Sequence, residues 1–228
     1  EFIEIVRDIR RRLLDVGNVS DKDYEAIPLQ GSGTFGLEAV LASTVPSNGE
    51  VLVVINGAYG HRIAKIASIL KIPVHTLVYA ENSYPELHEI DAALQENERI
   101  SHVVVVHCET TSGIINPIRE IGELVRKRDR VYFVDAMSSF GAVPIDVAEC
   151  RIDYLVSSAN KCIEGVPGFC FVLARRDTLL STEGYARSLS FDLLAQWKGL
   201  ESNGQFRFTP PTHCLLAFHQ ALLELEQE

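Results

Sequence analysis

Lys161 lies at a position in the chain that suits covalent chemistry. It follows the apolar run YLVSS at 154–158 and precedes a Gly- and Pro-rich stretch at 165–168. Burial between two apolar strands would lower the pKa of its amine and make it a nucleophile that can form a Schiff base. The alternative is an ordinary loop lysine that reaches into solvent. Lys161 alone does not decide between the two.

Asp135 directly follows the apolar run VYFV at 131–134 and precedes Lys161 by 26 residues. A carboxylate at the end of a buried strand costs free energy unless a cation or hydrogen-bond donors meet it. A turn or capping aspartate is the simpler interpretation. The chemical interpretation is a carboxylate aimed at a protonated ring nitrogen, and the presence of Lys161 favours it.

Two further strand ends carry side chains that can contact a ligand. Tyr59 follows the apolar run at 51–55, and its flat ring can stack on another flat ring. Thr110 and Thr111 follow the run at 102–107. Their hydroxyls suit either turn hydrogen bonds or polar atoms of a ligand.

The stretch GSGTFG at 31–36 has the glycine spacing of a dinucleotide-binding loop. That loop needs an acidic residue at the end of the next strand, to bind ribose. Here the next strand ends in Asn56, whereas Glu50 lies at its start, and Pro28 interrupts the preceding strand. A helix that begins near Gly33 still offers free amides to a phosphate. The stretch therefore predicts a phosphate site that does not hold a dinucleotide.

Short Val- and Ile-rich runs alternate with amphipathic stretches, which is typical of buried strands and crossover helices. We predict an α/β fold of three layers, with a mostly parallel sheet flanked by helices. Ligands of such sheets bind at the carboxyl ends of the strands. We expect strands at 51–55, 74–78, 102–107, 131–134, 154–158 and 168–174, buried on both faces, and helices at 2–16, 59–70, 85–95, 117–128, 189–200 and 213–226.

Composition excludes several classes of function. A net charge of −10 argues against a nucleic-acid surface. No apolar run approaches the roughly 20 residues that cross a membrane. The five cysteines are odd in number and lack a CxxC pair, which is typical of reduced thiols in a cytoplasmic protein. Histidine and cysteine also lack metal-ligand spacing, so we expect no metal site.

Together these stretches resemble fold type I pyridoxal-phosphate enzymes, in the class V aminotransferase branch with the alanine–glyoxylate and serine–pyruvate aminotransferases. The resemblance covers residues 24 to 220. It implies an N-terminal helical segment at 1–23, a large cofactor-binding domain at 24–210, and at 211–228 the start of a helix that leads to a C-terminal small domain. It is carried by LQGSGTFGLEAVL, VINGAYGHRI, HCETTSGIINPI, FVDAMSSFGAVPID, DYLVSSANKCIEGVPGF and FRFTPPTH.

The resemblance implies a role for each matching residue. Lys161 would form the Schiff base with pyridoxal 5′-phosphate and move the substrate proton, and Asp135 would hold the ring nitrogen. Tyr59 would stack on the ring, and Thr110 or Thr111 would lie near its phenolic oxygen. The phosphate would contact Ser32, Gly33, Thr34 and Asn160, and Phe206 and Thr209 would close the site of the partner subunit in a homodimer.

Within this branch the similarity is greatest to enzymes of phosphonate catabolism that move the amino group of 2-aminoethylphosphonate to pyruvate. Their products are phosphonoacetaldehyde and alanine. An alanine–glyoxylate or serine–pyruvate aminotransferase shares every cofactor residue named and stays an alternative. A cysteine desulfurase fits less well, because that branch stacks a histidine where Tyr59 lies here. A nucleotide-binding module and a non-catalytic relic are the alternatives from other classes.

The chain starts at Glu1 and stops at Glu228 within helical runs. We therefore expect a fragment of a longer protein. The small domain that in this branch carries the arginine for the substrate carboxylate would be truncated. The sequence does not identify the phosphonate-binding residues either. A fragment without catalytic activity stays an alternative.

Overall fold

Seven strands form one sheet in the order β1-β7-β6-β5-β4-β2-β3 in the computed structural model, which describes residues 1–227. All pairings from β6 to β3 are parallel, whereas β7 is antiparallel to both β6 and β1. The mostly parallel sheet predicted from the sequence is therefore confirmed. The strands are β1 (Tyr24–Gln30), β2 (Glu50–Ile55), β3 (Val74–Val78), β4 (Ile100–Val106), β5 (Val131–Asp135), β6 (Tyr154–Ser158) and β7 (Phe169–Arg175).

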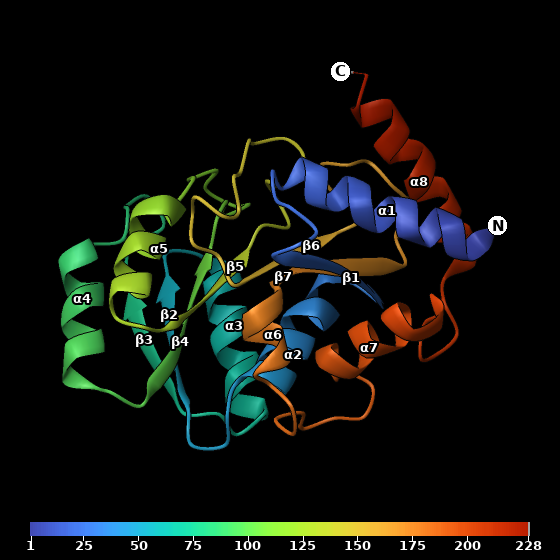
Figure 1. The fold of residues 1–228 in the computed structure, drawn as a ribbon. Coiled ribbons are helices and arrows are strands. Elements are labelled where there is room, and N and C mark those ends of the chain that lie inside the picture. Colours follow the sequence, from blue (N-terminus) through green and yellow to red (C-terminus); the bar gives the residue numbers. More distant parts are fainter. Residues whose placement is uncertain (228) are drawn as a thin grey trace.

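Helices cover both faces of the sheet, as Figure 1 shows for α1 above β1 and β7 and for α2 and α7 below them. On the first face α1 packs against α8, and α4 packs against α5. On the second face α2 contacts α3, α7 and the strands β6 and β7. None of the helices described between residues 1 and 227 has the length and apolarity needed to span a membrane. The helices are α1 (Phe2–Val16), α2 (Gly33–Thr44), α3 (Ala58–Ile69), α4 (Leu87–Glu96), α5 (Ile118–Lys127), α6 (Arg176–Leu180), α7 (Leu193–Asn203) and α8 (Thr212–Leu225).

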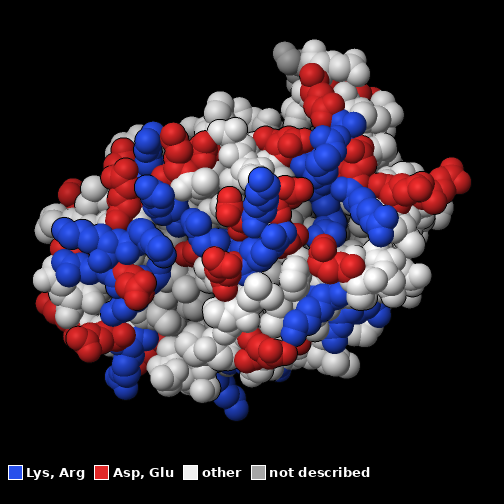
Figure 2. All heavy atoms as spheres, in the orientation of Figure 1, with Lys and Arg blue, Asp and Glu red and all other residues white. Residues whose placement is uncertain are grey.

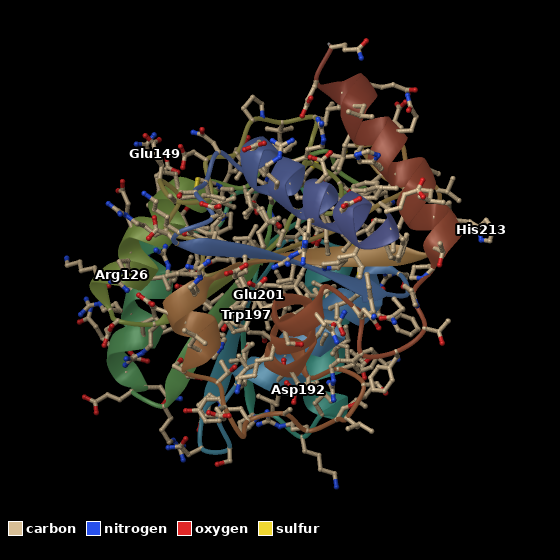
Figure 3. The ribbon with its side chains drawn as sticks, turned by 45° about the vertical axis from the view of Figure 1, so that its right-hand side comes forward. Arg126, Glu149, Asp192, Trp197, Glu201 and His213 are labelled. Carbon is tan, nitrogen blue, oxygen red and sulfur yellow. The ribbon has the colours of Figure 1, made fainter. Side chains whose placement is uncertain are left out.

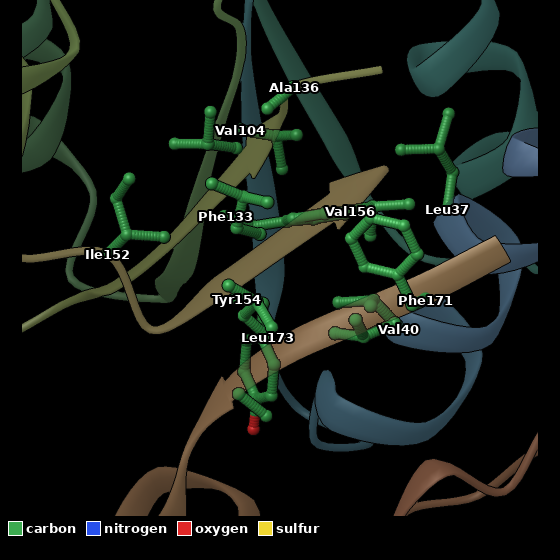
Figure 4. Packing of buried hydrophobic residues seen from close by; sticks show 14 of the residues in the cluster. Leu37, Val40, Val104, Phe133, Ala136, Ile152, Tyr154, Val156, Phe171 and Leu173 are labelled. Carbon is green, nitrogen blue, oxygen red and sulfur yellow. The ribbon is translucent and has the colours of Figure 1, made fainter. Parts of the chain in front are cut away.

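The central strands are buried on both faces, because helices lie above and below them. Val104 of β4, Phe133 of β5 and Val156 of β6 are completely excluded from solvent. Figure 4 shows Leu37 and Val40 of α2 directed at this group of residues. Branched and aromatic side chains at successive positions suit strands that are covered in this way. This rigid centre fixes where each strand ends.

The two edge strands differ from the sequence-based expectation. β3 was expected to be buried on both faces, and this is wrong: three of its five residues are exposed, because β3 pairs only with β2. β1 continues through Pro28, although we expected the proline to interrupt it. β1 pairs only with β7, and an edge strand tolerates the missing N–H of a proline.

Charged side chains cover the open edge of β1. The Arg10 guanidinium of α1 donates to the Ala26 carbonyl of β1 at 2.8 Å and to Glu201 of α7 at 2.6 Å. Figure 3 labels Glu201 on α7 beside this edge. Acidic and basic side chains are interleaved over the face shown in Figure 2. Pairing of this kind occupies a strand edge that is otherwise free to pair with another chain.

Helix α5 approaches the neighbouring loop closely at Gly122. A Cβ at this position would lie 2.0 Å from the Cys150 carbonyl oxygen. The residue is buried in a helix whose other buried positions are Ile118, Ile121 and Val125. The contact is with backbone, so no side-chain rotation relieves it. Only glycine fits there.

We therefore expect Gly122→Ala to destabilise the fold by about 1–3 kcal/mol, as other overpacked substitutions do. The matched control is Gly199→Ala in α7, where the added Cβ meets only the flexible Arg207 side chain at 3.3 Å and the Gln205 carbonyl oxygen at 3.5 Å. That variant should be neutral or gain about 1 kcal/mol from helix propensity. Urea unfolding of both variants measures the difference, and equal stabilities would contradict the packing described.

Candidate functional site

A cavity of about 160 Å³ opens at the carboxyl ends of β4, β5 and β6, between the first turns of α2 and α3. Most residues that the sequence singled out line this one cavity: Ser32, Gly33, Thr34, Tyr59, Thr110, Asp135, Asn160 and Lys161. Residues far apart in the sequence thus meet at one edge of the sheet. A larger hollow of about 580 Å³ lies between α1 and α5, but no lysine lines it.

The Asp135 carboxylate is the least satisfied group in the cavity. The residue is 2% exposed, and its Oδ1 accepts a 3.0 Å hydrogen bond from the Met137 amide. Its Oδ2 has no partner among residues 1–227. Burial raises the pKa of Asp135 to about 7, and the charge of Glu109 adds to this effect. A buried carboxylate with a free oxygen is stabilised by a hydrogen-bond donor that bears a positive charge.

Backbone hydrogen bonds fix the position of Asp135. Its carbonyl accepts from the His107 amide at 2.8 Å, and the next amide, of Ala136, donates to the Val156 carbonyl at 2.9 Å. The His107 ring is 2.8 Å from the Ser139 hydroxyl, and burial lowers the pKa of His107 to about 4. The backbone at Asp135 is therefore held on one side by β6 and on the other by the residue that follows β4.

The first turn of α2 forms the second wall. Ser32 occupies the N-cap position and makes no capping hydrogen bond through its side chain. The first amides of a helix have no partner within it, and together with the helix dipole they attract an anion. This wall can hold a phosphate.

The glycines that resemble a dinucleotide loop each have a local explanation. Gly31 has a φ of +106°, which favours glycine, and leads the chain from β1 into α2. A Cβ on Gly33 would lie 1.8 Å from the Met137 sulfur, and one on Gly36 would lie 2.9 Å from Val156. The spacing therefore follows from a turn and from close packing of α2 on the sheet.

Tyr59 lies in the first turn of α3 and is half-buried at the cavity. The Arg62 guanidinium carbon lies 4.7 Å from the centroid of its ring, within the range of a cation–π interaction. Arg62 also lines the cavity, together with Met137, Ser138 and Ser158. These four were not assigned from the sequence, because no motif at their positions marks them as ligand contacts.

Lys161 lines the cavity, but its side chain is exposed in this chain. The expectation that it is buried between two strands is therefore wrong. The reason is local: β6 ends at Ser158, and Lys161 begins a tight turn in which its carbonyl accepts from the Glu164 amide at 2.8 Å. The turn leaves the lysine at the mouth of the cavity.

The structure distinguishes Thr110 from Thr111, which the sequence alone did not do. Thr110 lines the cavity, and its hydroxyl is 2.7 Å from the hydroxyl of Ser138. Thr111, which is exposed as Thr110 also is, lies outside the lining. Thr110 is therefore the hydroxyl available to a ligand in this cavity.

Phe206 and Thr209 lie outside the cavity of their own chain. Phe206 is half-buried against the core. Thr209 is exposed and lines a separate hollow beside Phe35 and Phe191. Its carbonyl accepts a 3.0 Å hydrogen bond from the Gln30 side chain, which anchors the backbone there.

The residues of the cavity fit pyridoxal 5′-phosphate. The unpartnered Oδ2 of Asp135 matches a protonated ring nitrogen, and the first turn of α2 matches a phosphate. The Tyr59 ring offers a flat surface, and Lys161 offers an amine at the same cavity. The cavity thus offers a matching group to the ring nitrogen, to the phosphate and to the amine-reactive carbonyl of that molecule.

Comparison with known proteins agrees with this fit. The family model described as aminotransferase class V matches residues 1–226. Proteins named 2-aminoethylphosphonate–pyruvate transaminase from Bacillus mycoides and Bacillus cereus are 52% and 50% identical to this chain over its whole length. The chain spans 63% of the length of each. The solved structure of pyridoxamine–pyruvate aminotransferase from Mesorhizobium loti is 25% identical, with a TM-score of 0.89 over 99% of this chain and 57% of that one.

The raised pKa of Asp135 predicts how stability varies with pH. The folded protein binds this proton more tightly than the unfolded chain, whose carboxyl pKa is near 3.8. The contribution of Asp135 to the free energy of unfolding of the cofactor-free protein should therefore fall as pH rises from about 4 to about 7, by about 1.4 kcal/mol for each unit of the shift, whereas the lowered pKa of buried His107 contributes with the opposite sign.

Asp135→Asn should remove this fall and stabilise the cofactor-free protein at pH 8, because the amide keeps the Met137 hydrogen bond without a buried charge. Urea unfolding across this pH range measures the effect. The matched control is Asp129→Asn, which replaces an exposed aspartate with φ +53°. A parallel pH profile for wild type and Asp135→Asn would contradict the account.

Proposed function

The chain belongs to the aminotransferase class V family, and from this premise we propose that the natural protein carrying it is a pyridoxal-phosphate-dependent transaminase. Its amino donor is 2-aminoethylphosphonate and its acceptor is pyruvate, which yields phosphonoacetaldehyde and alanine. The assignment of the cofactor rests on one observation: Oδ2 of buried Asp135 has no partner among residues 1–227, and it lies at a cavity that Lys161 also lines. The activity for which relatives of 52% and 50% sequence identity are named supports the choice of substrates.

When bound, pyridoxal phosphate supplies an electron-withdrawing ring that stabilises negative charge on the substrate carbon. The role of Asp135 is to keep a proton on the ring nitrogen. Its Oδ1 is already held by the Met137 amide, so Oδ2 is the oxygen that faces a ligand. A positive charge beside it would favour the ionised carboxylate, as opposite charges do.

Lys161 acts as the amine that holds the cofactor and as the base that moves the substrate proton. An amine that takes a proton from one carbon and returns it to another must reach both. The turn after β6 places Lys161 at the mouth of the cavity, with an exposed and unrestrained side chain. Its position is compatible with both tasks.

The remaining walls hold and orient the ligand. The amides at Ser32, Gly33 and Thr34 bind the phosphate at the N-terminus of α2, and Asn160 adds a polar group beside them. Tyr59 packs on the ring. The Thr110 hydroxyl, which pairs with Ser138, contacts the phenolic oxygen.

A second copy of the chain completes the site in this proposal. Phe206 and Thr209 contribute to the phosphate site of the partner in a homodimer. The exposure of Thr209 and its anchored backbone support this role, because the side chain is free to contact another subunit. We place the enzyme in the cytoplasm, in keeping with five free cysteines.

Lys161→Ala should abolish the visible absorbance of lysine-bound pyridoxal phosphate and lower transaminase activity by at least about a thousandfold, because both amine functions are lost. Lys65→Ala in α3, an exposed lysine outside the cavity, is the matched control and should keep both. Borohydride reduction followed by peptide mapping locates the attached lysine. Attachment at another lysine would overturn the assignment.

The choice of donor is tested with the natural protein, supplied separately with 2-aminoethylphosphonate, alanine and serine. We expect alanine to form from pyruvate with the phosphonate donor at a kcat/KM at least about a hundredfold above that with serine. Turnover of alanine with glyoxylate but none of the phosphonate would favour the alternative aminotransferase.

A further inference from the structure

Helix α3 begins without a capping side chain of its own. Its N-cap residue is Gly57, and Tyr59 lies within its first turn. Gly57 has an extended backbone with φ 177°, which any residue adopts. Its conformation therefore does not require glycine.

The reason for glycine is Glu109, which lies on the neighbouring loop after β4. A Cβ on Gly57 would lie 2.4 Å from both the carboxyl carbon and Oε2 of Glu109. The Glu109 carboxylate accepts from the Gly60 amide at 3.1 Å and from the Tyr59 amide at 3.4 Å. A glutamate some fifty residues away in sequence therefore caps the helix.

Glu109 is completely buried, so these amides replace the water that its side chain would otherwise contact. Its own backbone is fixed as well: its amide donates to the Ile114 carbonyl at 3.1 Å, and its carbonyl accepts from the Gly113 amide at 2.7 Å. The negative charge of Glu109 also raises the pKa of Asp135, so a glutamate at this position makes the ionised form of Asp135 less stable. A carboxylate that is anchored at one end and bonded to α3 at the other makes a rigid link.

We propose that Glu109 is a positioning residue, which fixes the first turn of α3 and thereby holds the Tyr59 ring as a wall of the cofactor cavity. The link joins the loop of Thr110 to the helix of Tyr59, so two walls of the cavity keep one mutual orientation. This inference rests on the proposed function only for the identity of the ligand.

The first test needs no cofactor. In Glu109→Ala, hydrogen exchange at the Gly60 amide should become at least about tenfold faster, because a charge-assisted hydrogen bond is lost. Glu109→Gln keeps an accepting oxygen without the charge and should retain part of the protection, even if the alanine variant folds poorly. Glu98→Ala is the control, since Glu98 is an exposed glutamate just before the other end of β4. Unchanged exchange at Gly60 in both Glu109 variants would overturn the proposal.

The second test is a double-mutant cycle that uses pyridoxal phosphate affinity. Glu109→Ala should weaken binding at least about fivefold when Tyr59 is present, and by less than about twofold in the Tyr59→Ala background. Equal weakening in both backgrounds would show that Glu109 acts without Tyr59 and would contradict the inference. Absence of binding by the wild-type protein would instead refute the proposed function, while the exchange result would still decide the role of Glu109.

Discussion

The structure depends on the placement of a carboxylate at the end of a buried strand. Asp135 follows four apolar residues of β5, and the sheet on both sides excludes water from it. One oxygen receives a backbone amide and the other receives nothing within residues 1–227. Such a group destabilises the folded chain at neutral pH unless a ligand supplies a positive charge. The same feature that costs stability therefore creates affinity for a cationic ring.

The architecture explains why the remaining groups meet there. Parallel strands β4, β5 and β6 end at one edge of the sheet, and the helices that follow β1 and β2 begin at the same edge. The first turn of α2, the Tyr59 ring and Lys161 thus arrive from three separate segments. Close packing fixes them: Gly33 lies against Met137, and Gly57 lies against Glu109. Each glycine lets a helix start approach the strand ends more closely than a larger residue would.

Much of this site could be predicted from the sequence, because strand ends in an α/β fold are recognisable from apolar runs. Asp135, Lys161 and Tyr59 each follow such a run, and the cavity contains all three. The exposure of Lys161 and of β3 could not be predicted, since it depends on which strand lies at an edge and how one loop turns. The capping role of Glu109 could not be predicted for a different reason. The amides that it accepts from lie about fifty residues away, and no sequence pattern marks a helix cap supplied by another segment. Whether Thr110 or Thr111 faces the cavity likewise depends on the path of a single loop.

We propose that the free oxygen of Asp135 keeps a proton on the ring nitrogen of bound pyridoxal phosphate. Nitrogen NMR of the natural protein loaded with cofactor labelled at the ring nitrogen tests it most directly. We expect a protonated nitrogen through neutral pH in the wild-type protein and an unprotonated one in Asp135→Asn. An unprotonated nitrogen in the wild-type protein, or no change on substitution, would contradict it.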